Sequence, residues 1–290
     1  MKAVSVALGG GGSRGLAHLG ALQVLEEEGI EISSVSGISA GAITGARWCI
    51  DPNATFLSLS AIELLSSPEF RRLRIGGMML AGANEERTGL LQTLRSLVRR
   101  GLHLAHLARR NSVVEEGILE ELVSLLVGEG DFSDCRIPFQ VVALDLKEAR
   151  LVTFRDGPLL PAITASCALP GIFPPVEIET MQLIDAGAVS SVPVAAARTA
   201  DPNAVVLAID PSRRLLASES LDSGVEVIQR VAGISRNWLT EQELTDADLV
   251  VRPKVGQRSW SDLNDLASLV EAGRVAMQAS MPQLLELVEA

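Results

Sequence analysis

The sequence predicts an α/β fold in three layers, with helices on both faces of a mainly parallel central sheet. The first observation is a short apolar segment, residues 3–8, that leads through a glycine run into a helical pattern. The second is that the same order of strand, turn and helix repeats before residue 50, as in doubly wound sheets. The third is a composition with 47% hydrophobic but only 3% aromatic residues, which indicates a core of Leu, Val, Ile and Ala.

The expected elements follow from hydrophobic periodicity, taken in chain order. Residues 3–8 form the first strand, and the helix after the glycine run extends over 15–28 with its leucines on one face. A second strand, near 32–35, precedes a serine-containing turn and another helix. The later part of the chain is expected to hold a mostly helical region (53–127), four further strands (137–144, 151–154, 182–184 and 204–209) and a long helix from 263 onward. No repeat or linker interrupts this pattern, so we expect a single domain over 1–290.

Charge and cysteine content exclude several classes of protein. A net charge of −11 argues against a general nucleic-acid binder, because such a chain does not attract phosphate. Cys49, Cys135 and Cys167 are far apart and odd in number, so they form neither a disulfide framework nor a metal site. The sequence has no signal-peptide core and no apolar stretch of about 18 residues. We therefore expect a cytoplasmic protein that needs no metal or other cofactor.

One segment departs from this acidic character. Residues 71–110 contain nine Arg and two Glu, a net charge of +7. Within it, basic side chains recur every three or four residues opposite a leucine face, which is the pattern of a helix that lies on anionic lipid. We expect 71–110 to form a helical cap in which 88–110 contacts an anionic membrane surface. A solvated helix face is the alternative.

A serine occupies the turn after the second predicted strand. The segment Gly37-Ile38-Ser39-Ala40-Gly41 has the G-x-S-x-G pattern between a strand and a helix. In that context the serine lies on a sharp, strained turn with its oxygen exposed at the end of the sheet. Glycines are needed on both sides because side chains would crowd the turn or the substrate. The pattern predicts that Ser39 is a nucleophile, and a turn without chemistry is the alternative.

The glycine run after the first strand is a candidate anion site. Backbone N–H groups at a helix N-terminus attract negative charge. Gly10, Gly12 and Gly15 satisfy G-x-G-x-x-G, but the second strand does not end in the acid that a dinucleotide site needs, since Glu31 precedes that strand. A P-loop is disfavoured because no G-K-[S/T] follows. We therefore expect the amides of Gly10, Gly11 and Gly12 to form an oxyanion hole, with a plain tight turn as the alternative.

The three histidines are poor partners for Ser39. His18 lies in the first predicted helix, where it is expected to pack or cap, and His103 and His106 lie in the basic helix. None of them occupies the late loop position that the order serine, acid, histidine requires. A carboxylate is therefore the expected base.

Asp185 is the first candidate for that carboxylate, because it ends an apolar strand and small residues follow it. Asp145 and Asp210 end other strands and are rivals on the same argument. We expect Ser39 and Asp185 at the carboxyl ends of neighbouring strands, where ligand sites of such sheets lie. An aspartate of ordinary pKa is a weak base for a hydroxyl unless burial raises its pKa or an oxyanion hole shares the work.

Taken together, these motifs resemble the patatin-like phospholipase family, in particular its short bacterial single-domain members. The resemblance covers nearly the whole chain. It is carried by four segments: Gly10 to His18, Gly37 to Gly41, Ala165 to Val176, and Asp185-Ala186-Gly187 followed by Val192-Pro193-Val194. One departure is Ala186, where the family usually has glycine, and its methyl group narrows the space beside Asp185.

The resemblance implies a hydrolase of fatty-acyl esters that uses a Ser–Asp dyad without histidine. Ser39 would be the nucleophile, Asp185 would take its proton, and the amides of Gly10, Gly11 and Gly12 with Arg14 would hold the oxyanion. The glycines that support these motifs would be Gly15, Gly37, Gly41 and Gly187. The resemblance leaves phospholipids, lysophospholipids and neutral lipids open as the substrate class. A catalytically silent protein that keeps the fold and binds an acyl ligand or a partner is the second hypothesis, and a nucleotide-binding protein is the third.

Overall fold

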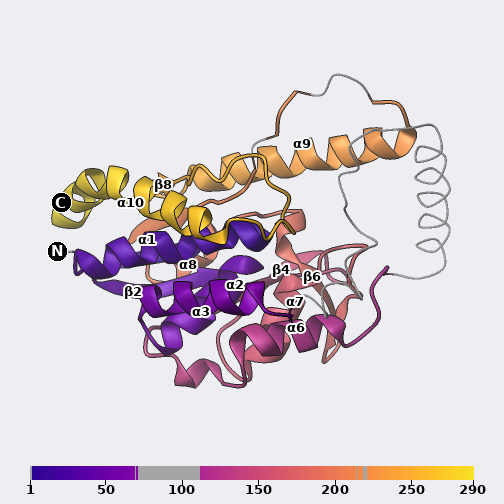
Figure 1. Ribbon diagram of the computed structural model, residues 1–290, viewed down its shortest axis with the longest axis horizontal. Coiled ribbons are helices and arrows are strands. Elements are labelled where there is room, and N and C mark those ends of the chain that lie inside the picture. The colour runs from indigo at the N-terminus through magenta and orange to yellow at the C-terminus, as the bar shows by residue number, and fades with distance from the viewer. Residues whose placement is uncertain (1, 69, 71–111, 214, 218–220) are drawn as a thin grey trace.

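The computed structural model describes residues 2–68, 70, 112–213, 215–217 and 221–290 (Figure 1). The expected cap at 71–110 and its basic helix at 88–110 lie outside these residues. In the described part of the chain, no helix is both long enough and apolar enough to cross a membrane.

A single eight-stranded sheet forms the middle layer of the described chain. Its strand order is β5-β6-β3-β2-β1-β7-β8, and β4 pairs with β3 outside this path. The pairs β3–β2, β2–β1, β1–β7 and β7–β8 are parallel, whereas the pairs among β3, β4, β5 and β6 are antiparallel. The strands are β1 (Val4–Leu8), β2 (Ile32–Gly37), β3 (Phe139–Asp145), β4 (Arg150–Phe154), β5 (Val176–Ile178), β6 (Met181–Asp185), β7 (Val205–Ile209) and β8 (Leu249–Val251).

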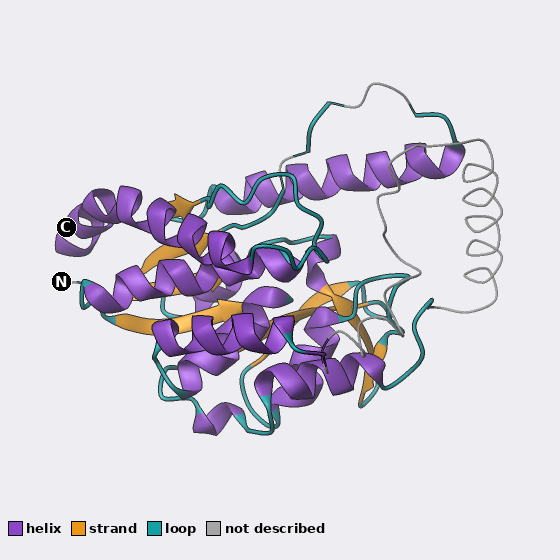
Figure 2. Ribbon diagram, in the orientation of Figure 1, coloured by secondary structure: helices purple, strands orange, loops and turns teal. Residues whose placement is uncertain are grey.

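Helices cover both faces of the sheet (Figure 2). Six of them share the larger hydrophobic core: α1 (Leu16–Glu27), α2 (Ala40–Ile50), α3 (Ala54–Ser66), α6 (Ile118–Val127), α7 (Leu159–Cys167) and α10 (Leu266–Glu289). The other face is covered by α8 (Val194–Ala200) and the end of α9 (Gly224–Leu244). Three short 3-10 helices complete the described chain: η1 (Gly12–Gly15), η2 (Phe132–Asp134) and η3 (Ala186–Ala188).

The alternation of side chains along β1 explains the three layers. Val4, Val6 and Leu8 point into the larger core, whereas Ala7 points into the core shared with α8. Successive residues of a strand face opposite sides, so a strand that is apolar at nearly every position must be covered twice. The expected three-layer α/β/α fold is therefore confirmed.

The direction of β6 differs from the expectation. β3 lies between β2 and β6, and β6 runs antiparallel to β3. Ser39 and Asp185 thus do not follow the carboxyl ends of neighbouring parallel strands, and the prediction was wrong on this point. The two-residue connection of Glu179 and Thr180 makes a hairpin of β5 and β6, so these two strands run antiparallel to each other. The direction of β6 relative to β3 comes from its pairing with a strand much earlier in the chain, which the linear sequence pattern does not contain.

Candidate active site

Ser39 lies on a tight turn between β2 and α2, as the motif predicts. Its backbone has φ 55° and ψ −121°, a conformation that residues other than glycine rarely adopt. Glycine is required on both sides of this turn for steric reasons. A Cβ at Gly37 would lie 2.5 Å from the carbonyl oxygen of Gly41, and one at Gly41 would lie 2.1 Å from that of Leu8. The turn therefore forms only where both positions lack side chains.

The amide of Ser39 is held by a residue far along the chain. Its N–H donates to Oγ of Ser166 at 2.9 Å, and the Ser166 hydroxyl donates to the carbonyl of Val142 in β3 at 2.7 Å. Ser166 is fully buried near the end of α7. Sequence reasoning assigned no role to Ser166, although it lies in the segment 165–176 that carried part of the family resemblance.

Asp185 lies at the end of β6 with only 1% of its surface exposed, and it meets Ser39 there. Burial raises the pKa of its carboxyl group to about 6, although a hydrogen bond with the Ser39 side chain, the amide of Gly187 and the charge of Arg236 act in the opposite direction. The N–H of Gly187 donates to Oδ1 of Asp185 at 2.7 Å. The structure thus brings Ser39 and Asp185 together, even though their strands are not neighbours.

The rival carboxylates are engaged elsewhere. Asp145 accepts the N–H of Lys147 at 3.0 Å, and Asp210 accepts the N–H of Ser212 at 2.9 Å. Asp210 also pairs with Arg252, with 3.5 Å between Oδ2 and Nε. Neither carboxylate contacts Ser39 in the part of the chain that the structure describes. Among the predicted acids, Asp185 alone reaches the serine there.

His18 is a buried residue of the first helix. It is fully enclosed, and burial lowers the pKa of its imidazole to about 4, so the ring is neutral at pH 7. This agrees with the prediction that His18 packs within the fold. His103 and His106 lie outside the described residues.

The glycine loop differs from the expectation at Gly10. The amide of Gly10 donates to the carbonyl of Ser191 at 2.8 Å, so it is not free for an anion. The amides of Gly11 and Gly12 have no partner among the described residues. Gly12 has φ 59°, and a Cβ there would lie 2.3 Å from the carbonyl oxygen of Trp260. Sequence reasoning could not separate Gly10 from its neighbours, because the partner that occupies its amide lies far along the chain.

Gly15 and Arg14 shape the same loop. A Cβ at Gly15 would lie 2.5 Å from Cβ of Ala40, so the glycine loop packs directly against the serine turn. Arg14 donates from Nε to the carbonyl of Gly11 at 3.0 Å. Burial, followed by the charges of Arg213 and Arg236, lowers the pKa of Arg14 to about 10, so its guanidinium stays charged at neutral pH. This positive charge lies beside the two free amides.

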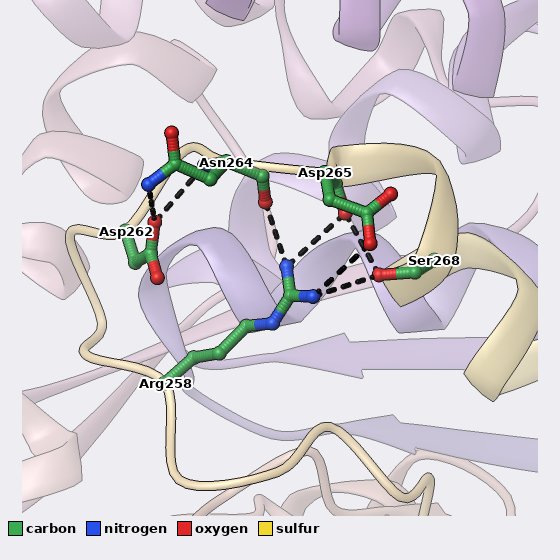
Figure 3. A network of polar contacts seen from close by, with 5 residues as sticks. All are labelled: Arg258, Asp262, Asn264, Asp265 and Ser268. Carbon is green, nitrogen blue, oxygen red and sulfur yellow. Dashed lines mark hydrogen bonds and ion pairs between the residues drawn. The ribbon is translucent and has the colours of Figure 1, made fainter.

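A second loop supports the glycine loop from outside. The carbonyl of Trp260 accepts the N–H of Ser13 at 2.8 Å. Arg258, two residues earlier, donates to the carbonyls of Asn264 and Asp265 at 2.6 and 3.1 Å and to Oγ of Ser268 at 3.0 Å (Figure 3). These bonds tie the loop to the start of α10. The position of the glycine loop therefore depends on the C-terminal part of the fold.

Ser39 lines an apolar cavity of about 380 Å³. It extends along α2, where Ser39, Ile43 and Arg47 line it at successive turns. Its remaining wall consists largely of aliphatic side chains from α1, α3 and α6, among them Leu19, Leu57, Leu64, Leu122 and Leu126. Sequence reasoning assigned these leucines no role in a site. Such a cavity accepts an apolar group beside the serine.

Ala186 follows Asp185 directly and begins the short helix η3. Its side chain is fully buried and packs with Ile38 and Val142 in a small apolar cluster. The methyl group therefore fills space between the serine turn and β3. Within the described residues, no group of three or more His, Cys, Asp or Glu side chains could hold a metal ion.

Comparisons with known proteins agree with this architecture. The family model for the patatin-like phospholipases matches residues 6–198. An uncharacterised NTE family protein of Mycobacterium tuberculosis is 29% identical over 192 residues, which cover 66% of this chain and 44% of that protein. A second NTE family protein of the same species is 24% identical over 99% of this chain and 48% of its own length. The chain thus spans less than half the length of these relatives.

Two solved structures share the fold. VipD from Legionella pneumophila superposes with a TM-score of 0.51 at 15% identity, over 99% of this chain and 67% of VipD. Human GIVD cytosolic phospholipase A2, in complex with methyl γ-linolenyl fluorophosphonate, superposes with a TM-score of 0.54 at 15% identity, over 99% of this chain and 59% of that enzyme.

Proposed function

This chain belongs to the patatin-like phospholipase family, and from that premise we propose that it cleaves fatty-acyl ester bonds of lipids with Ser39 as nucleophile and Asp185 as base. The observation that carries the proposal is the hydrogen bond between the buried carboxylate of Asp185 and the side chain of Ser39, a residue that lines an apolar cavity. The family match supports lipid hydrolysis in general. The dyad and the ester specificity are our inference from the residues around Ser39.

The first half of the reaction forms an acyl-enzyme. Oγ of Ser39 attacks the ester carbonyl carbon while its proton passes to the carboxylate of Asp185. The carbonyl oxygen becomes negatively charged and accepts hydrogen bonds from the amides of Gly11 and Gly12, with the charge of Arg14 nearby. When the tetrahedral intermediate collapses, the carbon–oxygen bond to the alcohol breaks. The alcohol leaves with the proton that Asp185 returns.

The second half repeats these steps with water. Asp185, ionised again, takes a proton from a water molecule that attacks the acyl carbonyl carbon. The bond to Oγ of Ser39 then breaks, the serine regains its proton from Asp185, and the free fatty acid leaves. A carboxylate whose pKa lies near 6 suits both directions of transfer better than one of ordinary pKa, because proton transfer is most efficient when the pKa lies near the working pH.

The cavity supports a fatty-acyl substrate. Each methylene group removed from water contributes about 0.8 kcal/mol of binding free energy. The part of the wall that α1, α3 and α6 provide is mainly aliphatic, so an acyl chain bound there would have its ester group beside the serine. This placement accounts for a nucleophile in the wall of an apolar cavity.

Two substitutions test the dyad. Ser39→Ala and Asp185→Asn should each lower hydrolysis of a medium-chain p-nitrophenyl ester by roughly a thousandfold or more, because each removes a group that acts in the chemical step. A fluorophosphonate probe should label the wild-type protein at Ser39. Ser36→Ala is the matched serine control, since this buried residue of β2 has no hydrogen-bond partner within the described residues. The Ser36→Ala variant should keep both ester hydrolysis and labelling by the probe.

A folded wild-type protein that neither hydrolyses esters nor reacts with the probe would contradict the proposal. That result would favour the silent, acyl-binding alternative. Asp210→Asn checks the assignment of the base, because Asp210 is the rival carboxylate that pairs with Arg252. A loss of activity as large in this variant as in Asp185→Asn would refute the role of Asp185.

A further inference from the structure

The carboxyl-terminal end of α7 touches both residues of the proposed dyad. We infer that residues 166–168 set the separation between Ser39 and Asp185, and that Ser166 is a positioning residue for the reaction. The inference rests on the proposed function, because it explains how that function's two groups are held together.

Ser166 makes the first of two connections. Its Oγ accepts the N–H of Ser39 at 2.9 Å and donates to the carbonyl of Val142 at 2.7 Å. A fully buried hydroxyl can accept one bond and donate another at the same time. Alanine offers neither bond, so it would leave the amide of Ser39 and the carbonyl of Val142 without these partners. Ser166 thus ties the serine turn to β3.

The second connection runs to Asp185. The N–H of Asp185 donates to the carbonyl of Ala168 at 3.0 Å. On the opposite side, Asp185 pairs with Ala143 in the β3–β6 ladder, and Ala143 follows Val142 directly. The serine turn and the acid are therefore fixed to the same two pieces of backbone, the end of α7 and the middle of β3.

The sheet itself does not provide this constraint. β2 and β6 are separated by β3, so no ladder of hydrogen bonds joins the strand before Ser39 to the strand that ends in Asp185. Ser39 also has a backbone conformation that persists only where its surroundings hold it. Ser166 supplies one such bond, directly at the strained residue.

Cys167 lies between the two connections. Its thiol hydrogen bonds with the Ser39 side chain, and it lines the cavity. Burial, together with the charge of Asp185, raises the pKa of this thiol well above its usual value. The thiol therefore stays neutral and does not compete with Ser39 as a nucleophile.

Ser166→Ala tests the inference against a matched control on the same helix. Thr164 is also buried, but its hydroxyl donates at 2.7 Å to the carbonyl of Leu160 within α7 and does not contact the dyad. Ser166→Ala should lower kcat for a soluble ester by about a hundredfold and change KM by less than about threefold, because the nucleophile is misplaced while the cavity is kept. Labelling by the fluorophosphonate probe should slow in parallel. Thr164→Val should keep both rates within about threefold of wild type.

A pH profile and a rescue variant separate positioning from general destabilisation. In Ser166→Ala, a weakened Ser39–Asp185 hydrogen bond should move the midpoint of the kcat/KM profile upward, since that bond lowers the pKa of Asp185. Ser166→Cys keeps a side chain of similar size with weaker hydrogen bonding, so its activity should lie between those of wild type and Ser166→Ala. If Ser166→Ala does not fold, Ser166→Cys replaces it in the kinetic and labelling experiments.

Wild-type labelling rates in Ser166→Ala, or in Ser166→Cys if the alanine variant does not fold, would overturn the inference. So would an equal loss of kcat in Thr164→Val. Both results differ from a failure of the proposed function, in which the wild-type protein itself would not react with the probe.

Discussion

The proposed chemical role of the Asp185 carboxyl group comes with an energetic cost. Burial disfavours its charged form, and the hydrogen bonds from Ser39 and Gly187 only partly compensate, so the pKa remains raised at about 6. At pH 7 roughly nine-tenths of the protein carries the ionised form that the proposed mechanism uses. The effect of this pKa on activity and its effect on stability can both be measured.

The activity should depend on the ionisation of Asp185. We expect kcat/KM to rise with pH and to level off, with a midpoint near 6, because only the carboxylate can accept the proton of Ser39. The rate of p-nitrophenol release between pH 4.5 and 8.5, corrected for the ionisation of the product, measures this profile. A rate that does not change across this range would argue against a titrating base of this kind.

The stability of the fold should also depend on the ionisation of Asp185, but in the opposite direction to activity. Stability should decrease as this carboxyl group ionises. The pKa of Asp185 is raised from 3.8 to about 6, so the folded state holds the proton more tightly than the unfolded chain. Its contribution to stability is therefore fully present below pH 3.8 and is lost as pH rises through 6, by about 3 kcal/mol in all. Asp185→Asn removes this dependence.

Urea unfolding of the wild type and Asp185→Asn at pH 4 and pH 7.5 tests this expectation. The stability of the variant relative to wild type should increase by about 2–3 kcal/mol between the two pH values. Other titrating groups are common to both proteins, so they largely cancel in the comparison. A relative stability that stays constant would show that burial does not raise this pKa.

At the scale of elements, sequence patterns identify what is local and miss what depends on distant partners. β1, α1 and β2 follow directly from apolar periodicity and glycine turns, and their bounds differ little from the prediction. β5 and β8 have three residues each, too few to show a periodicity. The antiparallel direction of β6 and the occupied amide of Gly10 both depend on pairings across the fold, so the linear pattern does not contain them.

The crossing of α1 and α10 depends on two glycines. A Cβ at Gly20 would lie 1.8 Å from the carbonyl oxygen of Val270, and one at Gly273 would lie 1.8 Å from that of Ala17. The two helix backbones are therefore in direct contact. Gly20→Ala should lower the free energy of unfolding by about 1–3 kcal/mol or more, because the helices must separate to admit the methyl group.

Gly233 in α9 is the matched control for this substitution. Among the residues that the structure describes, a Cβ there would meet only Cδ1 of Leu215, at an ordinary distance of 3.6 Å. Alanine favours the helix over glycine, so Gly233→Ala should raise stability by up to about 1 kcal/mol. Urea unfolding measures the change in the free energy of unfolding in each variant. Equal changes in Gly20→Ala and Gly233→Ala would refute the close contact between α1 and α10.

At the scale of the whole molecule, the cavity is the feature that the sequence does not reveal. Its wall combines residues from η1 near the N-terminus, from α2, α3 and α6, and from the loop before α10. Each leucine in this wall fits the pattern of an ordinary core residue, because a periodicity of 3.6 does not distinguish a side chain that packs against protein from one that faces an empty space. The serine turn could therefore be predicted, whereas the shape of the space beside it could not.

The spacing of α2 makes this cavity testable as an acyl site. Ile43 lies one turn beyond Ser39, about 6 Å along the helix, and lines the cavity. Ile43→Trp should fill the space past the nucleophile, so kcat/KM for a dodecanoyl ester should fall at least about tenfold while that for a butyryl ester changes less than about threefold. Leu59→Trp adds the same side chain on the exposed side of α3, at a residue that is 65% exposed, and should change neither rate. An equal decrease for both esters in Ile43→Trp would mean that the chain lies outside this cavity, because only a bound tail makes the effect of the tryptophan depend on chain length.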